Sequence, residues 1–224
     1  ILGIATILAV PLASVGAATL NNFTITNYDI QYELSKDSEN RSVLKANETI
    51  VADFKVANQN RGIERAIPKS YDSHSVSLKI DSVTDENGKE YEYSTSTSNS
   101  NEVLRIGNPD KYVSGEKTYK ISYTQRDVTR FYADVNKDEW YWDTNGTQWR
   151  VPIEQLRISI KIDDALTVTQ QGAPACYQGY NASAERCTLE DKGNGSYEVT
   201  ASNLRAGQNI TVAYGFTPDT FAQY

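Results

Sequence analysis

The sequence predicts an all-β fold, an antiparallel β-sandwich, and three observations support this prediction. Apolar and polar residues alternate along several stretches, whereas helical periodicity is nearly absent. Turn signals such as Asn-Gly and Gly-Asn-Gly separate these stretches. The chain has 224 residues, of which 39% are hydrophobic and 10% aromatic, so it can bury a sizeable core. Together these features are typical of two antiparallel sheets packed face to face.

The alternating stretches predict individual strands, which we take in chain order. In residues 23–34 the apolar residues first occupy odd positions and then even ones, which indicates a β-bulge near Asn27. The other stretches keep a single phase and place their apolar residues on one face of a half-buried sheet. These stretches cover residues 50–56, 118–123, 156–162 and 210–216.

Residues 1–18 are predicted to be a signal peptide or an N-terminal anchor. Residues 1–12 are apolar, residues 13–18 are mostly small, and the first charged residue is Asp29. An apolar run followed by small residues is typical of a secretory signal, here with cleavage near Ala17 or Ala18. We therefore expect the rest of the chain to lie outside the cytoplasm, either membrane-anchored or secreted.

The two cysteines, Cys176 and Cys187, are separated by ten residues. In an exported chain, two cysteines at this spacing favour a disulfide, and two unrelated thiols are the alternative. A C-x-x-C redox site is excluded by the spacing.

A weak internal similarity relates the two halves of the chain, because residues 77–81 resemble residues 159–163. It suggests two tandem β subdomains, a first sandwich over residues 19–152 and a second over residues 153–217 that contains the cysteines. Residues 218–224 would then form a linker toward a membrane segment. The alternative is that the similarity reflects only the general pattern of β-strands.

Residues 139–152 contain all three tryptophans and a strong hairpin signal, Asn145-Gly146. A type I′ turn there would place Trp142 opposite Trp149 and Trp140 opposite Val151, with the three rings on one face. One interpretation is an aromatic platform for a sugar or a peptide. The other is that the rings fill the core, as most large aromatic side chains do.

The composition excludes several kinds of chemistry. The formal net charge of −7 argues against nucleic-acid binding, and one histidine with two cysteines leaves no ligands for a His cluster or a four-Cys zinc site. Residues 134–139 resemble the start of a calcium loop, but Glu139 stands where the turn glycine should be. We therefore expect no catalytic residues, no metal and no cofactor. A pair of carboxylates for glycoside hydrolysis stays open, because sequence gives no distance between them.

Several motifs resemble the N-terminal extracytoplasmic domain of a prokaryotic family of predicted membrane proteins, domain of unknown function 2207. Residues 46–54 (ANETIVADF) are similar to its V-x-E-T-I-x-x-x-F strand, with Ala46 in place of valine. Residues 62–68 (GIERAIP) are similar to its G-I-x-R-x-I-P segment, and residues 104–123 and the opening strand at residues 23–32 also fit. Residues 141–153 (YWDTNGTQWRVPI) are similar to its Y-W-N-x-x-G-x-x-W-x-x-P-I segment, with Asp143 in place of asparagine.

The resemblance implies an exported β domain that is followed by transmembrane helices, which would lie beyond Tyr224. It brings no established activity or catalytic residues. Glu48 and Arg65 match its motifs, and each is a charge within apolar, strand-like sequence, so we expect them to form a structural ion pair.

These observations predict a non-enzymatic ectodomain of a membrane-anchored protein that acts in cell-surface interaction or assembly, with a protein or glycan partner. One alternative is a carbohydrate-binding or carbohydrate-active module that uses Trp140, Trp142 and Trp149. Another is an envelope or pilus-type structural subunit, which a long unpaired edge strand would favour.

Overall fold

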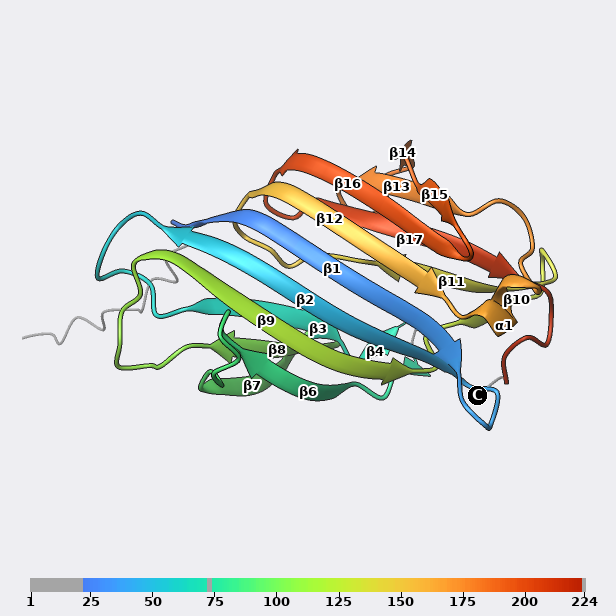
Figure 1. Ribbon diagram of the computed structural model, residues 1–224, viewed down its shortest axis with the longest axis horizontal. Coiled ribbons are helices and arrows are strands. Elements are labelled where there is room, and N and C mark those ends of the chain that lie inside the picture. The colour runs from blue at the N-terminus through green and yellow to red at the C-terminus, as the bar shows by residue number, and fades with distance from the viewer. Residues whose placement is uncertain (1–21, 72–73, 223–224) are drawn as a thin grey trace, which may run out of the picture.

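Strands with alternating burial dominate the computed structural model, which describes residues 22–71 and 74–222 (Figure 1). In β1 (Thr24–Lys36), Tyr28, Ile30, Tyr32 and Leu34 are buried, and the residues between them are exposed. The register shifts between Ile25 and Asn27, so the bulge expected from the change of phase is confirmed. The predicted signal or anchor segment, residues 1–18, lies outside the described residues.

One layer of the fold is a seven-stranded sheet in the order β15–β16–β12–β1–β2–β9–β6. Neighbouring strands are antiparallel except β1 and β12, which pair in parallel from Ile25 opposite Ile153 to Leu34 opposite Ile162. The other six strands of this sheet are β2 (Ser42–Phe54), β6 (Lys79–Thr84), β9 (Gly115–Arg126), β12 (Ile153–Ile162), β15 (Glu190–Gly193) and β16 (Ser196–Leu204).

The opposite layer contains a five-stranded sheet in the order β10–β11–β17–β13–β14 and a three-stranded sheet in the order β3–β8–β7. A two-stranded ribbon, β4–β5, and a single helical turn, α1, complete the fold. The five-stranded sheet consists of β10 (Arg130–Tyr132), β11 (Lys137–Asp143), β13 (Ala175–Gly179), β14 (Glu185–Arg186) and β17 (Asn209–Phe216). The remaining elements are β3 (Ile63–Pro68), β4 (Ser70–Tyr71), β5 (His74–Ser75), β7 (Tyr93–Ser98), β8 (Asn101–Ile106) and α1 (Asp164–Thr167).

The core lies between the two layers and is rich in aromatic rings. The ring of Tyr32 in the seven-stranded sheet meets Trp140 edge to face at 6.0 Å between centroids. Tyr197 and Tyr214 make a similar contact at 5.6 Å. Such pairs stabilise a core by about 0.5–1.5 kcal/mol beyond the burial of their area. The all-β sandwich predicted from the sequence is therefore confirmed.

The expected division into two tandem subdomains does not describe this topology. Strands β12 and β16, from the second half of the chain, extend the same sheet as β1 and β2 from the first half. The opposite layer is mixed in the same way, because β11 pairs with β17. The boundary expected between residues 152 and 153 thus falls inside one sandwich. Pairing between strands so far apart in sequence leaves no mark on local periodicity, which is why the sequence did not reveal it.

The residues after β17 are packed against the sandwich up to residue 222, so the linker expected over residues 218–224 is wrong for its described part. Phe221 is buried, with its ring 5.1 Å from that of Phe216. The backbone N–H of Phe221 donates to Asp138 at 3.1 Å, and that of Ala222 donates to the Asn40 carbonyl at 2.8 Å. Among residues 22–71 and 74–222, no helix is both long and apolar enough to cross a membrane.

Candidate binding groove

The predicted Asn-Gly hairpin is absent, and residues 144–152 follow a different path. Strand β11 pairs with β17, so Trp142 lies opposite Val212 and not opposite Trp149. Gly146 has a φ of 77°, but Asn145 does not share the positive φ that a type I′ turn needs. The Asn145 side chain instead bonds to the β17 region, accepting from the Ile210 N–H at 2.8 Å and donating to the Gln208 carbonyl at 3.1 Å. This tertiary partner replaces the local turn.

All three tryptophans are buried, so the predicted aromatic platform is wrong. Trp140 is 0% exposed, Trp142 1% and Trp149 6%. The ring of Trp142 packs 5.2 Å from that of Tyr71, and the ring of Trp149 meets Tyr28 edge to face at 5.9 Å. No ring presents a face to solvent, and the alternative interpretation, a place in the core, is the correct one.

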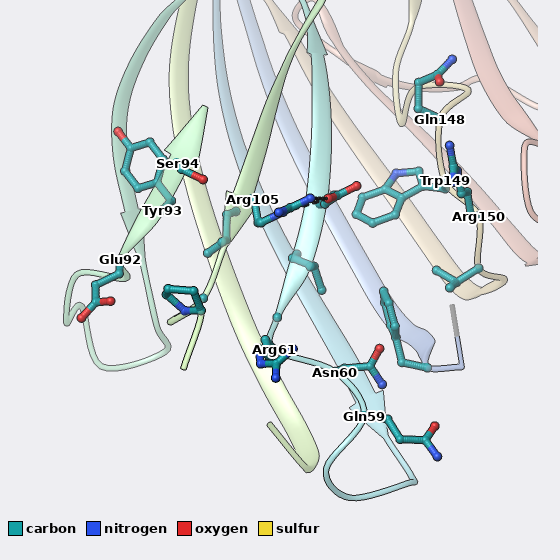
Figure 2. A pocket seen from close by; sticks show the side chains of 18 residues that line it. Gln59, Asn60, Arg61, Glu92, Tyr93, Ser94, Arg105, Gln148, Trp149 and Arg150 are labelled. Carbon is teal, nitrogen blue, oxygen red and sulfur yellow. Dashed lines mark hydrogen bonds and ion pairs between the residues drawn. The ribbon is translucent and has the colours of Figure 1, made fainter. Parts of the chain in front are cut away.

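Trp149 lines a groove of about 540 Å³ between the three-stranded sheet and residues 148–151 (Figure 2). One wall comes from β3, β8 and the start of β7, and Figure 2 shows Arg105 and Tyr93 on this side. The other wall carries Gln148, Trp149 and Arg150, and Arg61 lies at the lower end in this view. Grooves of this size that gather a few polar groups are the usual starting point for a binding-site hypothesis.

Three arginines line the groove and have different partners. Arg105 donates from Nε and Nη2 to a single oxygen, Oε1 of Glu64, at 3.0 and 2.7 Å. Arg61 donates to the Tyr112 hydroxyl at 2.9 Å, and its guanidinium carbon lies 4.3 Å from the Tyr112 ring centroid. The exposed guanidinium of Arg150 forms no ion pair with any carboxylate in the described part of the chain. Within residues 22–71 and 74–222, Arg61 and Arg150 are therefore cations without an anionic partner.

Two glycines bring the chain together at one end of the groove. Gly62 has a φ of 131° and Gly107 a φ of 137°, both in a region that other residues rarely adopt. A Cβ on Gly62 would collide with the carbonyl oxygen of Ile106, and a Cβ on Gly107 would collide with that of Arg61. The backbone at the start of β3 can therefore lie this close to the backbone at the end of β8 only if both positions are glycine.

The structure contains the ion pair expected between Glu48 and Arg65, directly beneath the groove wall. Arg65 donates from Nη2 to Oε1 of Glu48 at 2.7 Å and from Nε to Oε2 at 2.8 Å, and both side chains are at most 2% exposed. Tyr28 and Tyr123 donate their hydroxyls to the same carboxylate at 2.7 and 2.8 Å. The carboxylate thus accepts four hydrogen bonds and has no free site for chemistry.

The environment of this pair shifts the pKa values of its neighbours. Burial raises the pKa of Tyr28 and Tyr123 well above the ordinary tyrosine value, since it disfavours the charged phenolate. Burial also opposes the charge on Arg65, but the adjacent Glu48 carboxylate outweighs it and raises the pKa of the guanidinium. The guanidinium of Arg65 therefore stays protonated and positively charged beside Glu48.

Hydrogen bonds close to the buried ion pair hold the second groove wall in place. Nη1 of Arg65 donates to the Ala66 carbonyl and lies beside Gly146, where an added Cβ would be 2.9 Å away. The Tyr32 hydroxyl donates to the Thr144 carbonyl at 2.7 Å. The indole N–H of Trp149 donates to the Asn145 carbonyl at 2.9 Å. Residues 144–149 are thus fixed on the core, and Trp149 with them.

The other candidate residues lie elsewhere. Cys176 in β13 and Cys187, which follows the edge strand β14, lie at disulfide distance with their Cα atoms 5.1 Å apart. Residues 134–139, considered for calcium, span the β10–β11 turn and the start of β11. Across the described residues, no group of three or more His, Cys, Asp or Glu side chains is arranged to hold a metal.

The groove arginines were not singled out from the sequence, although each lies inside or next to a motif that was. Arg61 precedes the G-I-x-R-x-I-P segment, Arg105 lies two residues before Gly107, and Arg150 follows the last tryptophan. Their grouping depends on three segments that are distant in the chain. The local signal was a positive charge within two residues of a glycine or tryptophan of each motif.

A model for the N-terminal domain of predicted membrane proteins, DUF2207, matches residues 24–216. The chain belongs to the DUF2207 family. The resemblance found in the sequence motifs is thereby confirmed, and it covers both layers of the sandwich and the groove. No curated protein matches the sequence.

Among solved structures, this DUF2207 domain is similar in fold to leukotriene A4 hydrolase from Saccharomyces cerevisiae. The native enzyme gives a TM-score of 0.53 at 14% identity, over 92% of this chain and 32% of the hydrolase. The yeast enzyme in complex with bestatin gives 0.55 at 12% identity, over 92% and 31%. The chain spans about a third of the length of these hydrolases, and at such low identity the likeness shows a shared fold alone.

Proposed function

We propose that this DUF2207 domain is the non-enzymatic, extracytoplasmic binding module of a membrane-anchored protein, and that the groove takes its partner. The observation that carries the proposal is the set of three guanidiniums around one groove, two of which have no carboxylate partner among the residues that the structure describes. Arginines without an anionic partner, placed in a concave site, are suited to binding an anionic group of another molecule. The partner would be a protein or a glycan at the cell surface.

The acids of the groove support binding over catalysis. Glu64 accepts two hydrogen bonds from Arg105. Glu92 accepts one from the Asn108 side chain at 2.8 Å. A general acid or base works best when it is free to exchange a proton with the substrate. Both carboxylates already have donors within the chain.

The cysteines support an extracytoplasmic location. Cys176 and Cys187 lie within disulfide reach, and structural disulfides persist mainly in oxidising compartments. The family description as a predicted membrane protein supports a tether outside residues 24–216. An exported domain on a tether would present its groove to the cell surface or the medium.

The proposal is tested with two matched substitutions on β7. Ser94 lines the groove, whereas Ser96, two residues along the same exposed strand, does not. We expect the labelled chain to bind saturably to isolated cell envelopes of the organism that expresses it. Ser94→Trp should fill the groove mouth and weaken this binding by at least about tenfold, and Ser96→Trp should not. Absence of saturable binding would contradict the binding function, and equal effects of the two variants would contradict the groove as its site.

A second function, that of an envelope structural subunit, is favoured by β7 itself. This strand is the edge of the three-stranded sheet, pairs only with β8, and is exposed along all six residues. An exposed edge strand can add a strand from another chain. Sedimentation of the chain at rising concentration tests it: assembly that Thr95→Pro abolishes would support this role, since the backbone of Thr95 faces the free edge, and a monomer throughout would contradict it.

A further inference from the structure

We infer that the ligand of the groove is a short acidic peptide segment of a partner protein. This inference rests on the proposed binding function and adds the chemical class of the ligand. It combines the charge of the groove, the exposure of its rings and the backbone groups at its wall.

The charge of the groove is opposite to that of the molecule. The chain has a formal net charge of −7, yet three of its ten arginines line this one groove. With Glu64 and Glu92 as the acids of the lining, the formal balance is three positive against two negative groups. A planar guanidinium matches a carboxylate in two parallel hydrogen bonds, which Arg61 and Arg150 can offer. Aspartate and glutamate side chains carry such carboxylates.

The aromatic residues favour a peptide over a carbohydrate. A pyranose ring stacks on the open face of an aromatic ring, but Trp149 is only 6% exposed and presents no open face. Tyr93, at 43% exposure, stands at the rim. The groove therefore lacks the flat aromatic floor that stacking of sugars requires.

Backbone groups of β3 provide contacts suited to a peptide. The Gly107 N–H donates to the Glu92 carbonyl, so residues 105 and 107 direct their backbone bonds toward β7. Backbone bonds alternate along a strand, so residues 104 and 106 bond to their partners Arg65 and Ile63 in β3. Glu64, between those two, directs its N–H and C=O to the opposite edge, which faces residues 148–151. A peptide backbone can pair there.

The same edge is closed farther along, which limits the ligand to a few residues. At Ala66 the chain around Gly146 approaches the strand, and an added Cβ on Gly146 would be 3.7 Å from the Ala66 carbonyl oxygen. A long added strand would collide with this segment. The geometry points to a short segment whose acidic side chains meet Arg61 and Arg150 while its backbone meets Glu64.

The test is calorimetric titration of the full 224-residue chain with defined probes. The first probe is an end-blocked peptide of five alternating Asp and Glu residues, and its control is the matching Asn and Gln peptide. We expect the acidic peptide to bind at least about tenfold more tightly than the amide peptide at about 50 mM salt, with a smaller difference at about 300 mM. N-methylation of alternate backbone amides should weaken binding if the backbone pairs with Glu64.

Substitutions locate the binding. The double variant Arg61→Ala with Arg150→Ala should lose at least about tenfold in affinity for the acidic peptide. Arg157→Ala removes the same charge from the outer face of β12, where the side chain is 60% exposed, and should change the affinity by less than about twofold. Arg61 and Arg150 are exposed, so the variants should fold, and their thermal unfolding confirms this.

Two outcomes overturn the inference and are distinguishable from failure of the proposed function. Tighter, arginine-dependent binding of polygalacturonate would mean that the groove recognises an anionic polysaccharide. No binding of the acidic peptide, with envelope binding still sensitive to Ser94→Trp, would mean that the groove takes a ligand of another class. In both cases the proposed binding function would still hold, and the inference that the ligand is an acidic peptide would be wrong. Loss of envelope binding as well would overturn both.

Discussion

At the scale of single residues, the buried carboxylate of Glu48 links several strands. Its partners come from three other strands, Arg65 from β3, Tyr28 from β1 and Tyr123 from β9. A buried ion pair adds little net stability against an apolar replacement, but loss of one partner leaves an uncompensated charge in the core. The pair therefore fixes the position of β3, which carries Arg65, relative to the seven-stranded sheet, which carries Glu48. Because β3 also lines the groove, the pair fixes that groove wall as well.

Glu48→Gln should lower the free energy of unfolding by about 3–5 kcal/mol, because Arg65 would lose the charge that compensates its burial. The matched control is Glu64→Gln, which breaks the Glu64–Arg105 pair one residue away from Arg65. The side chains of Glu64 and Arg105 are 48% and 69% exposed, so Glu64→Gln should lower the free energy of unfolding by only about 0–1 kcal/mol. Denaturant unfolding of both variants measures the difference. Equal losses would show that the buried pair has no special role.

The same cluster predicts a loss of stability at alkaline pH. The pKa of Tyr28 and Tyr123 is raised by burial in the folded state, whereas an unfolded tyrosine titrates near about 10. The stabilising contribution is thus fully present below about pH 10 and decreases as the pH rises toward the folded values. Tyrosinate absorbance during a pH titration should show these tyrosines ionising only on unfolding. Tyr123→Phe should reduce this dependence, whereas Tyr180→Phe, exposed at 54%, should not.

At the scale of elements, local pattern predicts what is local and fails where tertiary partners decide. The alternation in residues 156–162 and 210–216 correctly gives β12 and β17 as strands. In β12 the apolar residues are buried on one face, as expected from a period of two. In β17 all eight residues are buried, so the half-buried strand expected there is wrong. The hairpin at Asn145 fails, since its side chain binds the β17 region and a turn signal cannot compete with that partner. The groove was not predictable for a similar reason. Its walls come from segments around residues 61, 105 and 150, which only the packed layers bring together.

The glycine contact between β3 and β8 yields a prediction at this scale. Gly62→Ala should destabilise by about 3 kcal/mol, because the new Cβ collides with the Ile106 carbonyl and the residue has a strained positive φ. Gly88→Ala is the matched control, with a φ of 82° but open space around the Cβ, and should cost about 1 kcal/mol. Thermal unfolding tests both. If the two variants unfold at the same temperature, the close approach is unimportant for the fold.

At the scale of the whole molecule, the parallel pairing of β1 with β12 joins the two halves of the chain (Figure 1). The family match across residues 24–216 agrees with a unit that includes both halves. The internal similarity that suggested two subdomains relates the regions of β6 and β12, which belong to one sheet with three strands between them. The segment 218–222 adds a further connection, since the backbone N–H groups of Phe221 and Ala222 donate to Asp138 in β11 and to Asn40 between β1 and β2.

The chain should therefore unfold in one cooperative transition, and neither half should fold alone. A fragment of residues 22–152 would expose the edge of β1 and lose β17, the strand on which β11 pairs. A fragment of residues 153–222 would expose the apolar face of β12, where Leu156, Ile158 and Ile160 are at most 4% exposed in the full fold. Calorimetry of the full chain should give equal calorimetric and van't Hoff enthalpies. Amide spectra of each fragment should show little dispersion, and mixing the fragments should restore it if they pair through β1 and β12. Two separate transitions, or a fragment of residues 153–222 that folds alone, would restore the two-subdomain interpretation.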